Sequence, residues 1–365
     1  MNSPIYCNPK TWLEGPAVEQ FRRVLTLHGI LRGAAFPDLH PGRGVPVGAA
    51  FLAQDIIYPA LIGNDIGCGM TLATTRTPAR KLKIDKLLRR LGNSPEEIIQ
   101  STARECLREE PAAPEDPLDM RGTLGHGNHF AEILAVENVL DSEAWNTIDA
   151  KQDEALLLVH AGSRAYGEKL WRDIAAKHGD DGIAPDSPDG AAYLAEHARL
   201  VEWASNNRRL VAQAIARLLA CDCDDLLNAT HNSITPVPDN CFLHRKGASA
   251  VTPGRLAVVA GTRGSFSYLV MPIGNPADYL FTIAHGAGRK WNRQSTRERV
   301  RAKHADEQSL LQTKLGTRVV CPSKELLYEE APEAYKDVEA VIADLQDFGL
   351  ARPVARLRPL VNIKP

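Results

Sequence analysis

The sequence predicts a mixed α+β fold in which residues 1–365 form one compact domain, with a strand-rich core, glycine-rich turns and helices packed outside. Apolar segments broken by glycine and proline, at residues 25–50 and 258–270, are typical of strands joined by turns. Helical periodicity occurs in three blocks, at about residues 80–110, 187–220 and 333–346. Residues that could form one polar site are spread from residue 65 to residue 285, and this favours one domain over two because they must meet.

The helical blocks differ in how clearly their ends are marked. In the first block a new helix should start at Ser94, which combines an N-cap residue with Pro95 and Glu96 in the first turn. Residues 112–117 read as a surface loop. The block at 187–220 is either one long helix or two, because Asn206 and Asn207 interrupt its apolar pattern.

The composition is that of an ordinary globular protein, with 44% hydrophobic and 24% charged residues. No apolar run approaches the roughly 20 residues that cross a bilayer, and the N-terminus lacks the pattern of a signal peptide, so we expect a cytoplasmic protein. Seven cysteines, an odd number, indicate reduced thiols. A net charge of −2 excludes an overall basic coat, so nucleic-acid contact would require a local patch.

Residues 63–70, with the sequence GNDIGCGM, indicate half of a metal site. Three glycines in this run allow a tight turn, so that Asp65 and Cys68 can converge on one point. A carboxylate beside a thiolate suits a first-row divalent ion whose other ligands are imidazoles. Ligand softness alone favours zinc.

Histidines stand beside four further glycine-rich turns. His129 lies in GTLGHGNHF with His126, His160 at the end of the apolar strand LLLVHAGSR, His231 in NATHN and His285 in FTIAHGAGR. Any one of them could be a half-buried histidine bonded to backbone. A mononuclear or binuclear metal site beside a nucleotide phosphate explains them jointly, because glycine turns let a phosphate approach backbone N–H groups.

Two other segments carry weaker signals. The segment PDLHPGRG places Asp38, His40 and Arg43 on turns, where we expect them to be exposed. A basic run follows His285 and is opposed within its own span only by Glu298. It consists of Arg289, Lys290, Arg293, Arg297, Arg299, Arg301 and Lys303. This run is either a patch for an RNA or nucleotide phosphate backbone or the solvated face of a helix.

Taken together, these segments resemble the RtcB family of RNA-splicing ligases. The matching segments are PDLHPGRG, GNDIGCGM, GTLGHGNHF, HAGSR, THN, RKGA, HGAGR, PEAYKD and the penultimate Lys364, in family order and over nearly the whole chain. The resemblance implies a GTP- and manganese-dependent enzyme that joins RNA ends bearing a 2′,3′-cyclic phosphate or 3′-phosphate to 5′-hydroxyl ends.

The resemblance also implies residue roles. His285 would be the guanylylated nucleophile. Two Mn²⁺ ions would be held by Asp65, Cys68, His129, His160 and His231, with Cys68 as a bridge. Guanylate contacts would fall on Asn128, His129, Phe130, Ala131, Glu132, His231, Asn232, Ala260, Gly261, Thr262, Arg263, Ser267, His285, Gly286, Ala287, Gly288 and Lys364.

The chain departs from the family pattern without losing any of these ligands. It has Ala260 where many members have proline, and Thr262-Arg263-Gly264 where many have Ser-Met-Gly. Its short middle resembles the bacterial branch that is coupled to release factor H, which implies repair of damaged tRNA or rRNA fragments. Two other readings stay open: a metal phosphoesterase that only opens cyclic phosphates, and a non-catalytic RNA- or ribosome-binding module with a structural metal.

Overall fold

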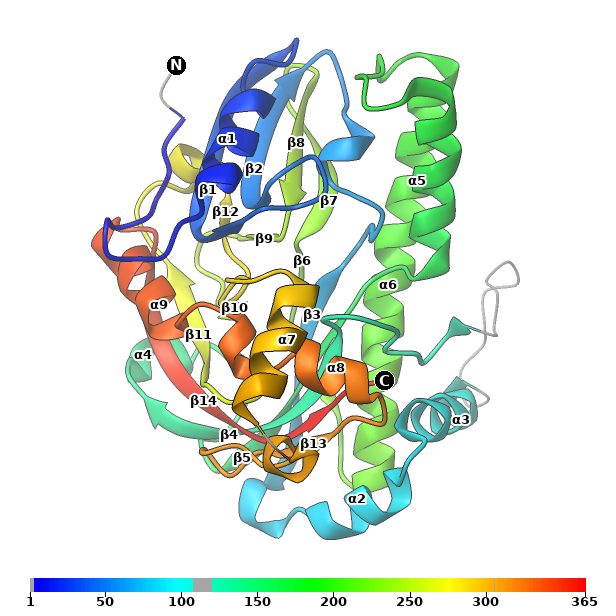
Figure 1. Ribbon diagram of the computed structural model, residues 1–365, viewed down its shortest axis with the longest axis vertical. Coiled ribbons are helices and arrows are strands. Elements are labelled where there is room, and N and C mark those ends of the chain that lie inside the picture. Colours follow the sequence, from blue (N-terminus) through cyan, green and yellow to red (C-terminus); the bar gives the residue numbers. More distant parts are fainter. Residues whose placement is uncertain (1–2, 108–119, 305) are drawn as a thin grey trace.

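The fold is mixed α/β with a sheet-rich core, as the sequence predicts (Figure 1). This computed structural model describes residues 3–107, 120–304 and 306–365. The predicted surface loop at 112–117 and the last residues of the predicted 80–110 block lie outside them. In the described part of the chain, none of the helices has both the length and the apolar character needed to cross a membrane.

The strands and helices follow one another along the whole chain. The strands are β1 (Ile30–His40), β2 (Val47–Gln54), β3 (Gly69–Pro78), β4 (Phe130–Val139), β5 (Glu154–Ala161), β6 (Asp224–Thr230), β7 (Asn232–Val237), β8 (Cys241–Lys246), β9 (Ala248–Ala250), β10 (Ala257–Val259), β11 (Ser267–Pro272), β12 (Thr282–Ala284), β13 (Arg318–Val320) and β14 (Ala351–Ile363). The helices are α1 (Gly15–Val24), α2 (Ile84–Leu91), α3 (Pro95–Leu107), α4 (Ser142–Trp145), α5 (Ala165–His178), α6 (Pro188–Leu219), α7 (Arg293–Lys303), α8 (Lys324–Glu329) and α9 (Val338–Asp347).

The larger sheet brings together the segments that carry the predicted ligands. Its strand order is β10-β11-β14-β4-β5-β3-β6, and β13 also pairs with β14. Gly69, the first residue of β3, pairs with Ala161 at the end of β5 and with Thr230 at the end of β6. Residues next to these three positions therefore meet at one edge of the sheet, although they are far apart in sequence.

The smaller sheet has the order β1-β2-β8-β7 and lies beside the larger one (Figure 1). Helix α1 packs on β1, and the short pair β12 and β9 contacts β1 and β2. This arrangement brings the end of β1 next to the segment that follows β12, which carries His285. A second set of distant segments thus meets near the first.

Helix α6 is one continuous helix along the side of both sheets (Figure 1). Ser187 caps it by accepting a hydrogen bond from the Gly190 N–H, as the predicted start requires. Asn207 does not break it because its side chain is buried and bonds outward, accepting from Gly122 N and donating to Thr123 O. The interruption in the apolar pattern therefore marks a contact and not a helix end.

The prediction for the last helical block was wrong at its start. Residues 332–334 form a separate 3-10 turn, and α9 begins at Val338 after Asp337, whose side chain accepts the Glu339 N–H. The first block is confirmed as two helices, with α3 starting directly after Ser94. All seven cysteines are free thiols, as their odd number indicated.

Candidate functional site

Five side chains from four segments form two overlapping groups of potential metal ligands. Cys68, His160 and His231 make one group, and Asp65, Cys68 and His129 make the other, with the ligand atoms of each group within 4.8 Å of one another. The Cys68 Sγ lies 3.2 Å from His160 Nε2 and 3.4 Å from His129 Nε2. His160 Nε2 is in turn 3.2 Å from His231 Nε2. Cys68 is thus common to both groups, as a bridging ligand would be.

The chemistry of the donor set fits divalent cations. Burial lowers the pKa of His160 and of His231 well below the ordinary value, and neighbouring histidines lower it further, so both rings are neutral and offer lone pairs. Burial also raises the pKa of the Cys68 thiol, so its proton would leave only when a cation replaces it. The donor atoms of Cys68, His160 and His231 therefore face one another with no positive charge among them. A bound metal ion would supply that charge.

Asp65 fits against a glycine turn and pairs with His129. A Cβ on Gly162 would lie 2.0 Å from Asp65 Oδ1, so only glycine leaves room for that carboxylate. Asp65 Oδ2 lies 2.8 Å from His129 Nε2. Burial alone would raise the pKa of Asp65, but His129 and Arg164 lower it overall, which keeps the carboxylate charged.

A buried arginine lies beneath this cluster. Arg208 of α6 is fully buried and donates to Gly67 O at 2.8 Å and to Ala161 O at 2.9 Å. It also donates to Asn228 Oδ1 at 2.7 Å. One guanidinium therefore joins the turn before Cys68, the end of β5 after His160, and β6, which leads to His231. No pattern in the sequence predicts this role, because Arg208 lies in a helix with other arginines.

His285 has a carboxylate partner that fixes its tautomer. Its Nδ1 lies 2.6 Å from Asp38 Oδ2, and its backbone N–H donates to the same oxygen at 3.1 Å. Asp38 is fully buried in β1, so the prediction of an exposed turn residue was wrong. His40 ends the same strand and is half-buried, also contrary to prediction, whereas Arg43 is exposed on a turn as expected.

The prediction for Asp38 was wrong for a physical reason. Proline, glycine and charge in residues 37–44 are typical of a turn, but Lys336 donates to Pro37 O at 2.9 Å and to Leu39 O at 2.7 Å and so holds the segment as strand. With Nδ1 protonated and bound to Asp38, Nε2 of a neutral His285 keeps its lone pair. The His285 and His231 rings are 4.7 Å apart between centroids, so the histidine adjoins the ligand cluster.

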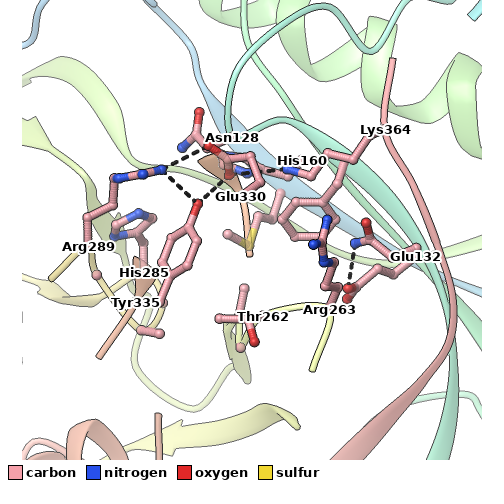
Figure 2. A pocket seen from close by; sticks show the side chains of 18 of the residues that line it. Asn128, Glu132, His160, Thr262, Arg263, His285, Arg289, Glu330, Tyr335 and Lys364 are labelled. Carbon is pink, nitrogen blue, oxygen red and sulfur yellow. Dashed lines mark hydrogen bonds and ion pairs between the residues drawn. The ribbon is translucent and has the colours of Figure 1, made fainter. Parts of the chain in front are cut away.

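A pocket that is partly open to solvent extends from this histidine. Figure 2 shows His285, Arg289 and Tyr335 on one wall, with Glu132, Arg263 and Lys364 facing them and Thr262 between. The predicted guanylate contacts that line it are Asn128, Phe130, Glu132, Ala260, Gly261, Thr262, Arg263, His285, Gly286, Ala287, Gly288 and Lys364. Most of the predicted set therefore surrounds one space.

The remaining predicted contacts lie behind the lining. His129 and His231 belong to the ligand cluster, and Ala131 is buried in β4. Ser267 is buried and its Oγ accepts the Gly261 N–H at 3.0 Å, so it supports the loop from the rear. Asn232 links two loops by donating to Asp65 O at 3.1 Å and accepting from Gly247 N at 2.8 Å.

Ionisable groups on the pocket walls are strongly perturbed. Glu330 is buried, and although burial alone would raise its pKa, Lys364 and Arg289 bring it down to about 2. Glu330 lies 2.8 Å from Arg289 Nη1 and 3.3 Å from Lys364 Nζ. Burial raises the pKa of Glu132 to about 7, against the hydrogen bond that it accepts from Asn362 at 2.8 Å. The pocket thus contains one carboxylate that stays charged, Glu330, and one carboxyl group whose pKa lies near neutral pH, Glu132.

Sequence reasoning missed several of these residues. Tyr335 lies in the matched PEAYKD segment, so that motif could have pointed to it. Glu330 and Asn362 carried no local signal, because their roles depend on strands and loops that are joined only in the fold.

Several cations of the basic run after His285 are paired with acidic side chains that lie outside the run. Arg289 pairs with Glu330, and Arg297 lies 3.4 Å from Glu329. Lys303 pairs with Glu333 at 3.0 Å. These acidic residues lie in α8 and in the segment after it, so the sequence of the run alone could not reveal the pairs. Arg299 and Arg301 of α7 stay exposed.

Comparison with known proteins agrees with the motifs. The family model described as tRNA-splicing ligase RtcB matches residues 20–116 and 105–365. The chain is 39% identical over 358 residues to an Escherichia coli protein named RNA-splicing ligase RtcB2, covering 97% of this chain and 93% of that protein. It is 30% identical over 437 aligned positions to proteins of Mycobacterium bovis and Mycobacterium tuberculosis, both named RNA-splicing ligase RtcB, covering 94% of this chain and 100% of each of those. The resemblance is confirmed, and the chain belongs to the RtcB family.

Proposed function

We propose that this chain is an RNA ligase that uses GTP and two Mn²⁺ ions to join a 2′,3′-cyclic phosphate or 3′-phosphate RNA end to a 5′-hydroxyl end through guanylylated His285. The observation that carries the proposal is the His285–Asp38 pair, with Nδ1 and Oδ2 2.6 Å apart, on the wall of a pocket that adjoins a buried cysteine–histidine cluster. A structural metal alone would not require such a pair.

His285 acts as a nucleophile in this mechanism. Asp38 accepts a hydrogen bond from Nδ1–H, which leaves the Nε2 lone pair free. Nε2 attacks the α-phosphorus of GTP as the bond to the β-phosphate oxygen breaks and pyrophosphate leaves. The Asp38 carboxylate stabilises the positive charge that the ring gains on forming the Nε2–P bond. A phosphate oxygen of the RNA 3′ end then attacks the same phosphorus and releases His285. Finally, the 5′-hydroxyl attacks the activated 3′-phosphate and GMP leaves.

The ligand cluster would hold the metal ions. Asp65, Cys68 and His129 would bind one ion, and Cys68, His160 and His231 the other. When bound, the ions would stabilise negative charge on the phosphoryl oxygens and supply an activated water for opening a cyclic phosphate. Manganese is preferred over zinc only on the strength of the family resemblance.

The pocket residues would hold the guanylate. The glycine turn at Gly286 can present its backbone N–H to a phosphate oxygen, and buried Lys364 adds a positive charge. Glu132, with its pKa near 7, can accept hydrogen bonds from a purine edge. The cytoplasmic location, the single domain and the coupling to a release-factor-like protein remain predictions.

The test is intact mass spectrometry after incubation with GTP and Mn²⁺. The unchanged chain should gain one acid-labile GMP, and His285→Ala should gain none. His178→Ala is the matched control, because His178 also pairs with a carboxylate, Asp189 Oδ2 at 3.0 Å, but lies on α5 outside the pocket lining. Metal binding without any adduct would refute the ligase and favour a phosphoesterase, which should keep working as His285→Ala.

A further inference from the structure

A pair of tryptophans lies beside the pocket with cations over both rings. Lys290 Nζ is 5.3 Å from the ring centroid of Trp12 and 5.2 Å from that of Trp291. The Arg299 guanidinium is 4.8 Å from the Trp291 ring. The two aromatic side chains come from the segment before α1 and the segment before α7, so the fold brings them together.

The exposure of Trp12 needs an explanation. Trp12 is 52% exposed, whereas Trp145 and Trp203 are buried at 2% and 4%. A single exposed apolar ring is common, so it is the combination of the ring with nearby positive charge that points to a binding surface. In the part of the chain that the structure describes, Lys290 and Arg299 have no ion-pair partner, unlike Arg289, Arg297 and Lys303. Aromatic surface and unopposed positive charge thus coincide.

The tryptophan pair is directly connected to the pocket. Arg289 lines the pocket and its Nε donates to Trp291 O at 3.2 Å. The Lys290 N–H donates to Ala334 O at 2.7 Å, next to Tyr335 of the pocket wall. Because consecutive Cα atoms are about 3.8 Å apart, the Cα atoms of Trp291 and Arg289 lie within about 8 Å of each other. That distance equals about two stacked bases at roughly 3.4 Å each.

We propose that Trp12 and Trp291 form a stacking surface for the bases of single-stranded RNA that enters the pocket, and that Lys290 and Arg299 contact its phosphates. This inference rests on the proposed function, which brings an RNA 3′ end to His285 on the pocket wall. Aromatic rings interleaved with cations are the features that bind single strands without sequence preference. The cation–π contacts are weak at an exposed site and exchange readily for phosphate contacts.

The experiment measures the affinity of fluorescently labelled 3′-phosphorylated RNA of two and of ten nucleotides, without GTP, by anisotropy. The double variant Trp12→Ala/Trp291→Ala should bind the ten-nucleotide RNA about tenfold or more weakly than the unchanged chain, from the loss of base stacking. The dinucleotide should lose much less affinity in the double variant, because it offers at most two bases to the rings. Trp12→Phe/Trp291→Phe keeps flat rings and should stay within about threefold of the unchanged chain.

An abasic ten-unit strand of the same charge separates stacking from a charge effect. It should bind the unchanged chain and the double alanine variant equally. Equal affinity of these two proteins for the ten-nucleotide RNA overturns the proposal, and so does an equal loss for RNA and abasic strand. Melting temperatures of all variants verify folding. GMP-adduct formation by the unchanged chain tests the ligase separately, so a failure of the stacking surface is distinguishable from a failure of the proposed function.

Discussion

Replacing Asp38 by asparagine should slow guanylylation of His285 without abolishing it. Asp38 Oδ2 accepts two hydrogen bonds, one from the His285 ring and one from its backbone N–H. In Asp38→Asn the amide oxygen should occupy this position, because both partners are donors. The Nδ1–H tautomer therefore persists and Nε2 keeps its lone pair. Only the negative charge that stabilises the charged ring is lost.

The expected size follows from that difference. A hydrogen bond to a charged group contributes about 1.5–3 kcal/mol, against about 0.5–1.5 kcal/mol for a neutral one. Removing the charge should therefore cost about 1–2 kcal/mol, or about 5- to 30-fold in rate. Asp38→Ala also frees the ring to change tautomer, and a wrong histidine tautomer costs about 10⁴-fold in a serine protease whose aspartate partner is altered. The expected order of rates is unchanged chain, Asp38→Asn, Asp38→Ala.

The assay is the initial rate of GMP-adduct formation at saturating GTP, followed by intact mass. His285→Ala sets the background, and Mn²⁺ content is measured for each variant to exclude metal loss. A rate for Asp38→Asn equal to that of the unchanged chain would show that the carboxylate charge has no role. A rate at background would show that the tautomer is not held by the two donors, and either result refutes the reasoning.

Three further perturbations test the cluster and the pocket. Arg208→Met leaves the buried Gly67 and Ala161 carbonyl oxygens without this donor and also removes the bond to Asn228 Oδ1. Metal affinity should therefore fall about 10- to 100-fold, with Arg208→Lys between, as measured by Mn²⁺ titration, and unchanged affinity would contradict this role. Cys68→Ala should lose both ions and His231→Ala only one by elemental analysis, because only Cys68 belongs to both groups; a single lost ion in Cys68→Ala would exclude a bridge. Glu132 has a pKa raised from 4.5 to about 7, so the folded chain binds more protons than the unfolded chain between these pH values, and the free energy of unfolding falls as pH rises through them. In urea unfolding, Glu132→Gln should therefore be more stable than the unchanged chain by up to about 3 kcal/mol at pH 8 and equally stable at pH 4. A difference in the free energy of unfolding that does not change with pH would count against the raised pKa.

Local chemistry was sufficient to predict most of the cluster. Glycine turns beside Asp65, Cys68 and His160 indicated convergence before any fold was known, and the pairing of Gly69 with β5 and β6 explains why it occurs. The start of α6 at Ser187 was predictable for the same reason, since a cap acts over three residues. Signals of this kind lie within one turn of the chain.

Partners from distant segments could not be predicted. Asp38 was predicted on a turn because its own segment is rich in proline and glycine. Its burial depends on Lys336, nearly 300 residues away, which donates to the carbonyl groups on either side of it. The start of α9 was misjudged because Pro332 forms a separate turn and Asp337 supplies the cap. In each case a contact made by the folded chain outweighed a correct local preference.

Arg208 shows why the missed residues matter as much as the predicted ones. Cys68, His160 and His231 sit on three different strands or turns, and nothing in their own chemistry sets the distances between them. One buried guanidinium donates to atoms on the turn before Cys68, on β5 and on β6, so it couples the positions of those segments. A buried cation with only neutral acceptors is costly by itself. That cost is offset when the neighbouring cluster carries a thiolate and a carboxylate, which means that the arginine and the ligands favour one another's charged forms.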